Sequence, residues 1–294
     1  MSARTVRFKQ VDVFTAVPFK GNPLAVVFDA DDLATEDMQA IARWTNLSET
    51  SFLLKPADPA ADYRVRIFTP GGELPFAGHP TLGTAHALLD SGYRPRQAGR
   101  LVQQCGAGLV ELTGRGDGVW AFAAPPARVA SLPASTRTAL SVALRTDAID
   151  FSAAPCTTDN GVPWLVVRLK SAEACVALAP DVAALTAIVR ETGMDGLAVY
   201  GPHPEGGAVD FEIRCLMLGG SLGFGEDPVT GSANAAVAGL LKSQGLRPGS
   251  RYVARQGTAL GRDGRVHVDY DDDANRIWIG GHSVTIVDGT FRPG

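Results

Sequence analysis

Gly71-Gly-Glu-Leu-Pro-Phe-Ala-Gly-His-Pro-Thr-Leu-Gly-Thr-Ala-His-Ala-Leu-Leu89 is the stretch that decides the fold. It opens with turn-forming residues and continues into a segment that is almost entirely small or apolar, which is typical of a short helix inside a core. Pro80 suits the first helical position, so we expect His79 to be the N-cap and Gly92 to stop the helix. The stretch therefore predicts a buried helix whose free N–H groups and histidine face a possible ligand.

A similar stretch lies in the second half of the chain. Glu73-Leu-Pro-Phe-Ala-Gly-His79 aligns with Glu226-Asp-Pro-Val-Thr-Gly-Ser232, which pairs Gly78 with Gly231, and the apolar segment Ala233–Leu241 follows the second copy. Repeated sequence indicates repeated structure. We therefore predict an α+β protein of two pseudo-symmetric halves, each a curved β-sheet around its own central apolar helix. The two helix N-termini would then lie at a shared cleft.

The prolines indicate where one half ends and the other begins. A chain of 294 residues suits one large domain or two of ordinary size. Pro125, Pro126 and Pro133 lie close together near the middle, where a domain boundary is expected. The predicted halves cover residues 1–126 and 127–283.

Composition narrows the class of protein. Hydrophobic residues make up 45% and charged residues 20% of the chain, and the net charge is -4. This balance is ordinary for a globular protein and gives no basic footprint for nucleic acid. No apolar run approaches the roughly 18 residues that a membrane span needs, and the N-terminus lacks a signal-peptide core. The four cysteines show no C-x-x-C spacing and the five histidines no metal-ligand spacing, so we expect a cytoplasmic protein without a metal site.

Glu49 is the strongest candidate for catalysis. Alternation over a predicted strand, Leu47–Leu54, places it on one face with Ser51 and with apolar side chains. A carboxyl group in apolar surroundings keeps its proton to higher pH, which suits general acid/base catalysis near neutrality. The alternative is an ordinary strand-edge glutamate that is paired or solvated. The repeat favours catalysis, because the matching position near Gly196 carries no carboxylate.

Four further polar residues are candidates, each with an alternative structural role. His79 and Ser232 occupy equivalent positions at the two predicted helix starts, where serine is a common cap and histidine a less common one. Asp227 precedes a proline and is either a turn residue or part of the predicted cleft. Asn22 lies between Gly21 and Pro23, where turn formation is its first expected role.

Motifs spread in order over nearly the whole chain together resemble the PhzF-like family of phenazine biosynthesis. They are Asp12-Val-Phe-Thr15, Gly21-Asn-Pro-Leu-Ala-Val26, Asn46-Leu-Ser-Glu-Thr50, Phe76-Ala-Gly-His-Pro-Thr-Leu-Gly-Thr-Ala85, Gly225-Glu-Asp-Pro-Val-Thr-Gly-Ser-Ala-Asn234 and Gly280-Gly-His-Ser-Val-Thr-Ile-Val-Asp-Gly289.

The resemblance implies a diaminopimelate-epimerase-like fold, in which the last strand, residues 284–294, can complete the N-terminal half, and a homodimer. It also implies an isomerase that uses no cofactor and moves a proton with Glu49. The namesake reaction isomerises dihydro-3-hydroxyanthranilate to a ketone. The substrate site would include Gly78, His79, Asp227 and Ser232. We add Gly231 and Asn22 as candidate substrate-binding residues.

The resemblance leaves three functions open. The first is a Glu49-dependent isomerase of a small carboxylate-bearing metabolite. The second is an amino-acid racemase or epimerase, although related racemases carry a cysteine at the head of each central helix and Ala77 and Thr230 stand there instead. The third is a non-catalytic binding protein that has kept the fold. In each case a ligand carboxylate is expected at the helix N-termini around Gly78–His79 and Gly231–Ser232, because these carry partial positive charge.

Overall fold

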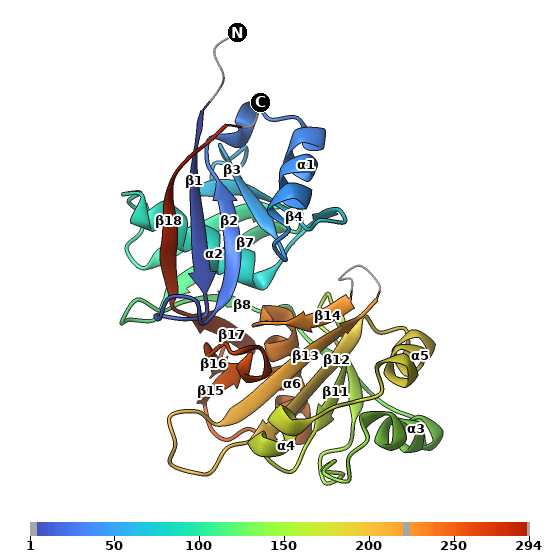
Figure 1. The fold of residues 1–294 in the computed structure, drawn as a ribbon. Helices are drawn as coiled ribbons and strands as arrows, with labels where there is room; N and C mark the ends of the chain where they lie inside the picture. The colour runs from blue at the N-terminus through green and yellow to red at the C-terminus, as the bar shows by residue number, and fades with distance from the viewer. Residues whose placement is uncertain (1–4, 220–223, 293–294) are drawn as a thin grey trace. The chain divides into compact units, whose positions relative to one another are not determined.

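The computed structural model describes residues 5–219 and 224–292 (Figure 1). Within them the chain forms two compact units. The first contains the residues up to Ala123 together with those from Gly280 onward, and the second is Ala124–Ile279. None of the helices in these described ranges is long and apolar enough to cross a membrane.

The first unit is built from strands that surround one helix. β1 pairs antiparallel with both β2 and β18, β2 runs parallel to β3, β3 pairs antiparallel with β4, and β4 runs parallel to β6. β7 pairs antiparallel with β6 and β8. The elements are β1 (Val6–Val13), β2 (Asn22–Val27), η1 (Ala30–Asp32), α1 (Thr35–Thr45), β3 (Thr50–Leu54), β4 (Tyr63–Phe68), β5 (Glu73–Leu74), α2 (Gly78–Asp90), β6 (Arg100–Cys105), β7 (Gly108–Gly114), β8 (Trp120–Ala123) and β18 (Ser283–Phe291).

The second unit repeats this order of strand pairings. β10 pairs antiparallel with β9 and β11, β11 runs parallel to β12, β12 pairs antiparallel with β13, and β13 runs parallel to β15. The elements are β9 (Arg128–Ser131), α3 (Ala134–Leu144), β10 (Cys156–Asp159), β11 (Pro163–Arg168), α4 (Ala172–Ala177), α5 (Val182–Thr192), β12 (Gly196–Pro202), β13 (Phe211–Leu218), β14 (Phe224–Asp227), α6 (Gly231–Gln244), β15 (Arg251–Gln256), η3 (Thr258–Leu260), β16 (Gly264–Asp271) and β17 (Arg276–Gly281).

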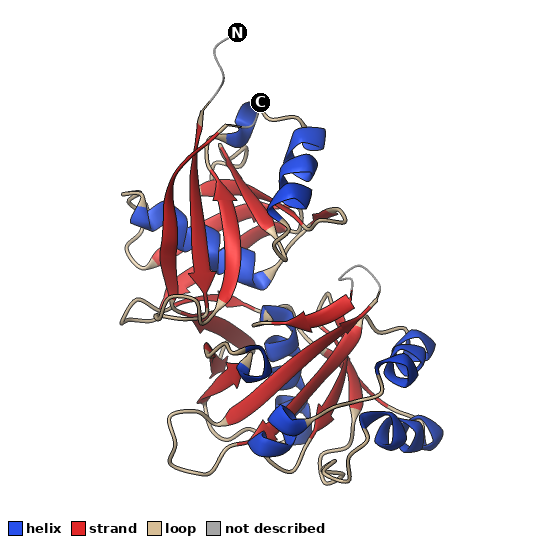
Figure 2. Ribbon diagram, in the orientation of Figure 1, coloured by secondary structure: helices blue, strands red, loops and turns tan. Residues whose placement is uncertain are grey.

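A buried helix occupies the core of each unit (Figure 2). α2 contacts β1, β2, β3, β8 and β18, and α6 contacts β9, β10, β11, β12 and β16. Small residues allow this close packing. A Cβ added at Gly83 would lie 2.6 Å from the Leu24 side chain and 2.7 Å from that of Val13, so only glycine lets α2 approach β1 and β2 so closely. The prediction of a buried apolar helix is confirmed for both stretches.

The helix starts differ from the sequence prediction. Ala77 is the N-cap of α2 and Thr230 is the N-cap of α6, so His79 and Ser232 are each the second helical residue. The assignment of both as caps was wrong. In α2 the reason lies in Pro80, which is the third helical residue, because no N–H of the first turn has an acceptor within the helix and proline is tolerated throughout that turn; Ser232 was assigned as a cap only by its alignment with His79.

The environment predicted for Glu49 also requires correction. β3 begins only at Thr50, so Glu49 lies in the connection between α1 and β3 and not within an alternating strand. Asn46 ends α1 as predicted, in the left-handed conformation with φ 53°. The chain needs Leu47–Glu49 to pass from this helix end to the strand, and this leaves no room for an earlier strand start.

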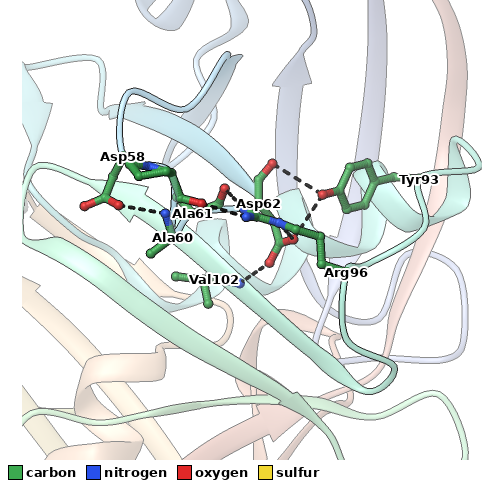
Figure 3. A network of polar contacts seen from close by, with 8 residues as sticks. Asp58, Ala60, Ala61, Asp62, Tyr93, Arg96 and Val102 are labelled. Carbon is green, nitrogen blue, oxygen red and sulfur yellow. Dashed lines mark hydrogen bonds and ion pairs between the residues drawn. The ribbon is translucent and has the colours of Figure 1, made fainter.

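An ionic network fixes the segment that precedes β4 (Figure 3). The Arg96 guanidinium donates to the Pro59 carbonyl at 2.6 Å and to Asp62 Oδ1 at 3.2 Å. The Tyr93 hydroxyl donates to the same Asp62 oxygen, and the Val102 N–H donates to the other one. These contacts join the segment after α2 to β4 and β6 and have a structural role.

Candidate active site

Glu49 and His79 are in contact within the first unit. His79 Nδ1 lies 3.4 Å from Glu49 Oε2, and the two side chains are 5% and 13% exposed, respectively. Glu49 comes from the connection before β3, and His79 from the first turn of α2. The geometry therefore places a nearly buried carboxyl group against an imidazole at the N-terminus of the central helix.

The His79 ring is neutral at physiological pH. Burial lowers the pKa of His79 to about 3, and a hydrogen bond to the Pro23 backbone opposes this shift only in part. A neutral imidazole has one N–H donor and one acceptor nitrogen. The Pro23 backbone has no N–H and can only accept, so the single N–H of the neutral ring serves that hydrogen bond, and His79 lies beside Glu49 without adding a positive charge.

Asn22 is the first residue of β2 and is fully buried. The turn before it is tight: the Gly21 N–H donates to Asp12 at 3.1 Å, and a Cβ at Gly21 would lie 2.1 Å from the Val13 carbonyl oxygen. The next residue, Pro23, is the one whose backbone faces His79. The Asn22 backbone is therefore held rigidly next to a residue that contacts the candidate site.

Gly78 and His79 are the first two residues of α2, and both are buried. Their N–H groups belong to the first turn and have no acceptor within the helix. Together with the helix dipole, they offer an environment that favours an anion. The structure thus joins the carboxyl group of Glu49 to a candidate anion site within one unit.

The second unit holds the other predicted residues at the start of α6. Asp227 ends β14 and is 7% exposed, and the Thr230 hydroxyl donates a short hydrogen bond to its Oδ2. Gly231 and Ser232 are the first two residues of α6. They form the counterpart of Gly78 and His79, as the alignment of the two stretches predicts.

Two residues that contact Ser232 were missed by the sequence reasoning. Trp164 Nε1 donates to Ser232 Oγ at 3.3 Å, and Asn160 Nδ2 donates to the Ser232 carbonyl oxygen at 2.9 Å. Asn160 lies in the β10–β11 turn, and Trp164 is the second residue of β11, within the stretch that echoes Pro23–Val27. The echo could have identified Trp164, because it aligns this residue with Leu24, two residues after Asn22.

The position of Glu49 has no acidic counterpart in the second unit. Ala25 pairs with Thr50 and Leu165 pairs with Leu197, so the residue that matches Glu49 is Gly196. A Cβ at Gly196 would lie 2.5 Å from the Leu216 carbonyl oxygen and 2.6 Å from the Trp164 ring. No side chain fits there, so the carboxylate belongs to one unit alone.

Residues 11–289 match the family model described as phenazine biosynthesis-like protein. The chain belongs to this family. A relative from Schizosaccharomyces pombe named antisense-enhancing sequence 1 is 38% identical over 96% of this chain and 97% of its own. The trans-2,3-dihydro-3-hydroxyanthranilate isomerase of Pseudomonas chlororaphis is 35% identical over 96% of this chain and 97% of its own.

Solved structures agree with this family assignment. A phenazine biosynthesis protein of the PhzF family from Bacillus anthracis has a TM-score of 0.85 and 26% identity, and the match covers 98% of this chain and 99% of that one. A hydroxyproline epimerase from Agrobacterium vitis has a TM-score of 0.64 and 16% identity over 98% of this chain and 93% of its own. The second likeness shows a shared fold alone.

This member of the phenazine biosynthesis-like family has no thiol at either helix start, since the N-caps are Ala77 and Thr230. Cys215 pairs with Asp227 across β13 and β14. Burial and the nearby charge of Asp227 raise the pKa of the Cys215 thiol, so it is not the reactive thiolate that a racemase needs. Within the described ranges, no group of three or more His, Cys, Asp or Glu side chains is placed to hold a metal ion.

Proposed function

We propose that this protein is a cofactor-independent isomerase of a small carboxylate-bearing metabolite, in which Glu49 moves the proton. The contact between Glu49 and the neutral His79 at the head of α2 is the observation that carries this proposal. Relatives named as isomerases, at about 35% identity over almost the whole chain, support it.

Glu49 acts first as a base and then as an acid. Its carboxylate takes a proton from a carbon that is activated by a neighbouring double bond, and the electrons shift along the unsaturated system. The carboxylic acid then returns the proton to a different carbon of the same molecule. No atom is gained or lost, so the product is an isomer. His79 packs against the Glu49 carboxyl group and adds no charge beside it.

The N-terminus of α2 binds the substrate carboxylate through the N–H groups of Gly78 and His79. Asn22 adds a polar side chain at the head of β2. The second unit carries a comparable set at the start of α6, where Asp227 can accept a hydrogen bond from an amino or hydroxyl substituent and the first turn, Gly231 and Ser232, supplies donors for a ligand of the same class. A cyclic, unsaturated amino acid such as the substrate named for the Pseudomonas relatives meets these requirements.

We also propose that the protein works as a homodimer in the cytoplasm, as expected for this family. Light scattering that gives twice the mass of one chain supports the dimer, and the mass of a single chain contradicts it.

The proposal is tested by proton exchange with solvent. The protein is incubated in D₂O with a panel of amino-substituted cyclohexadiene carboxylic acids and free amino acids, and deuterium incorporation is followed by NMR. We expect incorporation with a cyclohexadiene acid. Glu49→Gln keeps the shape but removes the base, and we expect it to lower turnover by roughly 10²–10⁴-fold.

Glu36→Gln is the matched control, because Glu36 is an exposed residue of the first turn of α1. We expect it to keep wild-type turnover. Turnover of Glu49→Gln within about threefold of wild type, a barrier difference of roughly 0.65 kcal/mol, would rule out Glu49 as the base. Exchange at the α-carbon of free amino acids alone would favour a racemase instead.

A further inference from the structure

Gln256, the last residue of β15, forms a hydrogen-bonded hub beneath the start of α6. It is fully buried, and its side chain uses its full hydrogen-bonding capacity. Oε1 accepts from the Thr230 N–H at 3.0 Å and from Asn234 Nδ2 at 2.9 Å. Nε2 donates to the Asp227 carbonyl oxygen at 3.0 Å and to Thr230 Oγ1 at 3.0 Å.

The orientation of the Gln256 amide is fixed by partners that have only one possible role. A backbone N–H can only donate, so the Gln256 atom that faces the Thr230 N–H must be the oxygen. A backbone carbonyl can only accept, so the atom that faces the Asp227 carbonyl must be the nitrogen. The two requirements agree, and they exclude the flipped amide.

This orientation decides the direction of the next hydrogen bond. The Thr230 hydroxyl accepts from Gln256 Nε2 and has a single proton of its own. That proton points to Asp227 Oδ2, with which the hydroxyl makes its short contact. Gln256 thus holds Asp227 at two points. It binds the Asp227 backbone carbonyl directly, and it orients the Asp227 carboxylate through the Thr230 hydroxyl.

The first unit contains a matching glutamine that does not reach a carboxylate. Gln103 is paired with Gln256 by the same alignment that pairs Gly78 with Gly231. Gln103 Nε2 donates to Thr81 Oγ1 at 2.9 Å, and the Thr81 hydroxyl donates to the Ala77 carbonyl oxygen. This chain of bonds ends on the helix cap, whereas the chain from Gln256 ends on Asp227.

We propose that Gln256 is a positioning residue that orients the Asp227 carboxylate through the Thr230 hydroxyl. Each repeat has a buried glutamine at this position, and only the one in the second unit has this role. The proposal rests on the proposed function in that Asp227 binds the substrate. Gln256 itself is fully buried and acts through Thr230.

The first experiment needs no ligand. Gln256→Glu keeps the length of the side chain but replaces the donor Nε2 by an oxygen, so the Thr230 hydroxyl is drawn to residue 256. Crystal structures of this variant and of Gln103→Glu, the matched control, are compared with that of wild type. We expect the contact between Thr230 and Asp227 to be lost in Gln256→Glu and kept in Gln103→Glu. An unchanged contact in Gln256→Glu overturns the proposal.

The second experiment separates positioning from a merely structural role. On a substrate accepted by wild type, we expect Gln256→Glu to raise KM by roughly tenfold and to change kcat by less than about threefold, because a binding contact is lost. In a double-mutant cycle with Asp227→Asn, the double variant should be no worse than Asp227→Asn alone. For Gln103→Glu combined with Asp227→Asn we expect the two effects on KM to multiply in full. If the effects of Gln256→Glu and Asp227→Asn also multiply in full, the proposal is overturned.

A second variant covers the case in which Gln256→Glu does not fold. Thr230→Val removes only the hydroxyl and leaves the bond between the Thr230 N–H and Gln256. We expect the same rise in KM and the same non-additivity with Asp227→Asn, and a wild-type KM contradicts the proposal. If wild type turns over no member of the panel, the proposed function fails, and the crystal structures still decide the role of Gln256.

Discussion

The His79 side chain is deeply buried and is also in direct contact with an acid, Glu49. A protonated ring would stabilise the Glu49 carboxylate strongly and weaken it as a base. Burial prevents this, because it lowers the pKa of His79 to about 3. The neutral ring therefore lies against Glu49 without placing a positive charge beside its carboxyl group.

The buried neutral His79 predicts a specific dependence of stability on pH. Its folded pKa, about 3, lies below its ordinary value of 6.5, so below pH 6.5 the unfolded chain takes up a proton that the folded chain refuses. This part of the stability is complete above pH 6.5 and is lost as the pH falls toward 3. Compared with His79→Gln, wild type should lose an additional ~2–3 kcal/mol between pH 7 and pH 4.5.

Urea unfolding of wild type and His79→Gln at several pH values measures this difference. Because only the slopes with pH are compared, the direct effect of the substitution on stability cancels. Equal slopes for the two proteins would mean that the folded and unfolded chains bind a proton at His79 equally well, so that burial does not keep the ring neutral. His282→Gln serves as a control, since that histidine lies in an exposed contact with the Asp117 carbonyl.

The sequence singles out the candidate residues of the site more clearly than it predicts their surroundings. Glu49 and His79 are candidates because of the repeat and the family motifs, and the structure brings their side chains into contact. The strand face assigned to Glu49 was wrong, because the left-handed Asn46 and the residues after it delay β3 until Thr50. Gln256 was missed because its partners come from α6 and β14, far away in sequence.

At the scale of elements, the first turns of α2 and α6 have the same construction and different side chains. The pattern of small residues predicts both helices but not their first residue, and in α2 proline is accepted within the first turn. Ser232 is the second residue of α6 and not its cap, and its hydroxyl accepts a hydrogen bond from Trp164. The hydroxyl proton is left to donate to another group.

We expect Ser232→Ala to weaken ligand binding by the value of one hydrogen bond. The affinity for 3-hydroxyanthranilate, an aromatic analogue of the substrate named for the relatives, should fall by about 0.5–1.5 kcal/mol. Gly231→Val should abolish binding, because a branched side chain would crowd a ligand that touches the backbone. Isothermal titration calorimetry gives both affinities.

Ser243→Ala is the control for this measurement, because the Ser243 hydroxyl bonds the Leu240 carbonyl oxygen in the last turn of the same helix. It should leave the affinity unchanged. An analogue without the carboxylate should bind more weakly than 3-hydroxyanthranilate. Equal affinity for the two would show that the helix N-termini do not bind the carboxylate.

At the scale of the whole molecule, the repeat in the sequence corresponds to a repeated order of strand pairings. The match between Pro23–Val27 and Pro163–Val167 marks β2 and β11, which each run parallel to the strand that follows an intervening helix. The alignment of the two halves places Gly196 opposite Glu49, but it could not show that a glycine is required there. That conclusion needs the close approach of Trp164 and Leu216.

The last strand of the chain belongs to the first unit. β18 pairs with β1 along its length, from Val6 opposite Phe291 to Val13 opposite Ser283. Lys9 of β1 is buried and contacts Asp90 of α2 and, at 3.2 Å, Asp288 of β18. Burial alone would lower the pKa of Lys9, but the hydrogen bonds to Asp90 and Asp288 outweigh it and raise the pKa. The first unit is therefore complete only when the end of the chain is in place.

Deletion of residues 283–294 should consequently weaken the first unit and spare the second. Without β18, β1 becomes an exposed edge and Lys9 loses one of its two carboxylate partners, while every strand pairing from β9 to β16 remains. By hydrogen–deuterium exchange, we expect amides of β1, β2 and α2 to exchange at least roughly tenfold faster than in wild type, with β11–β13 unchanged. Asp288→Asn, which removes only the ion pair, should give a smaller increase confined to β1 and β18. If exchange in the deletion variant accelerates equally in both units, the two do not unfold separately, and β18 stabilises the whole chain and not the first unit alone.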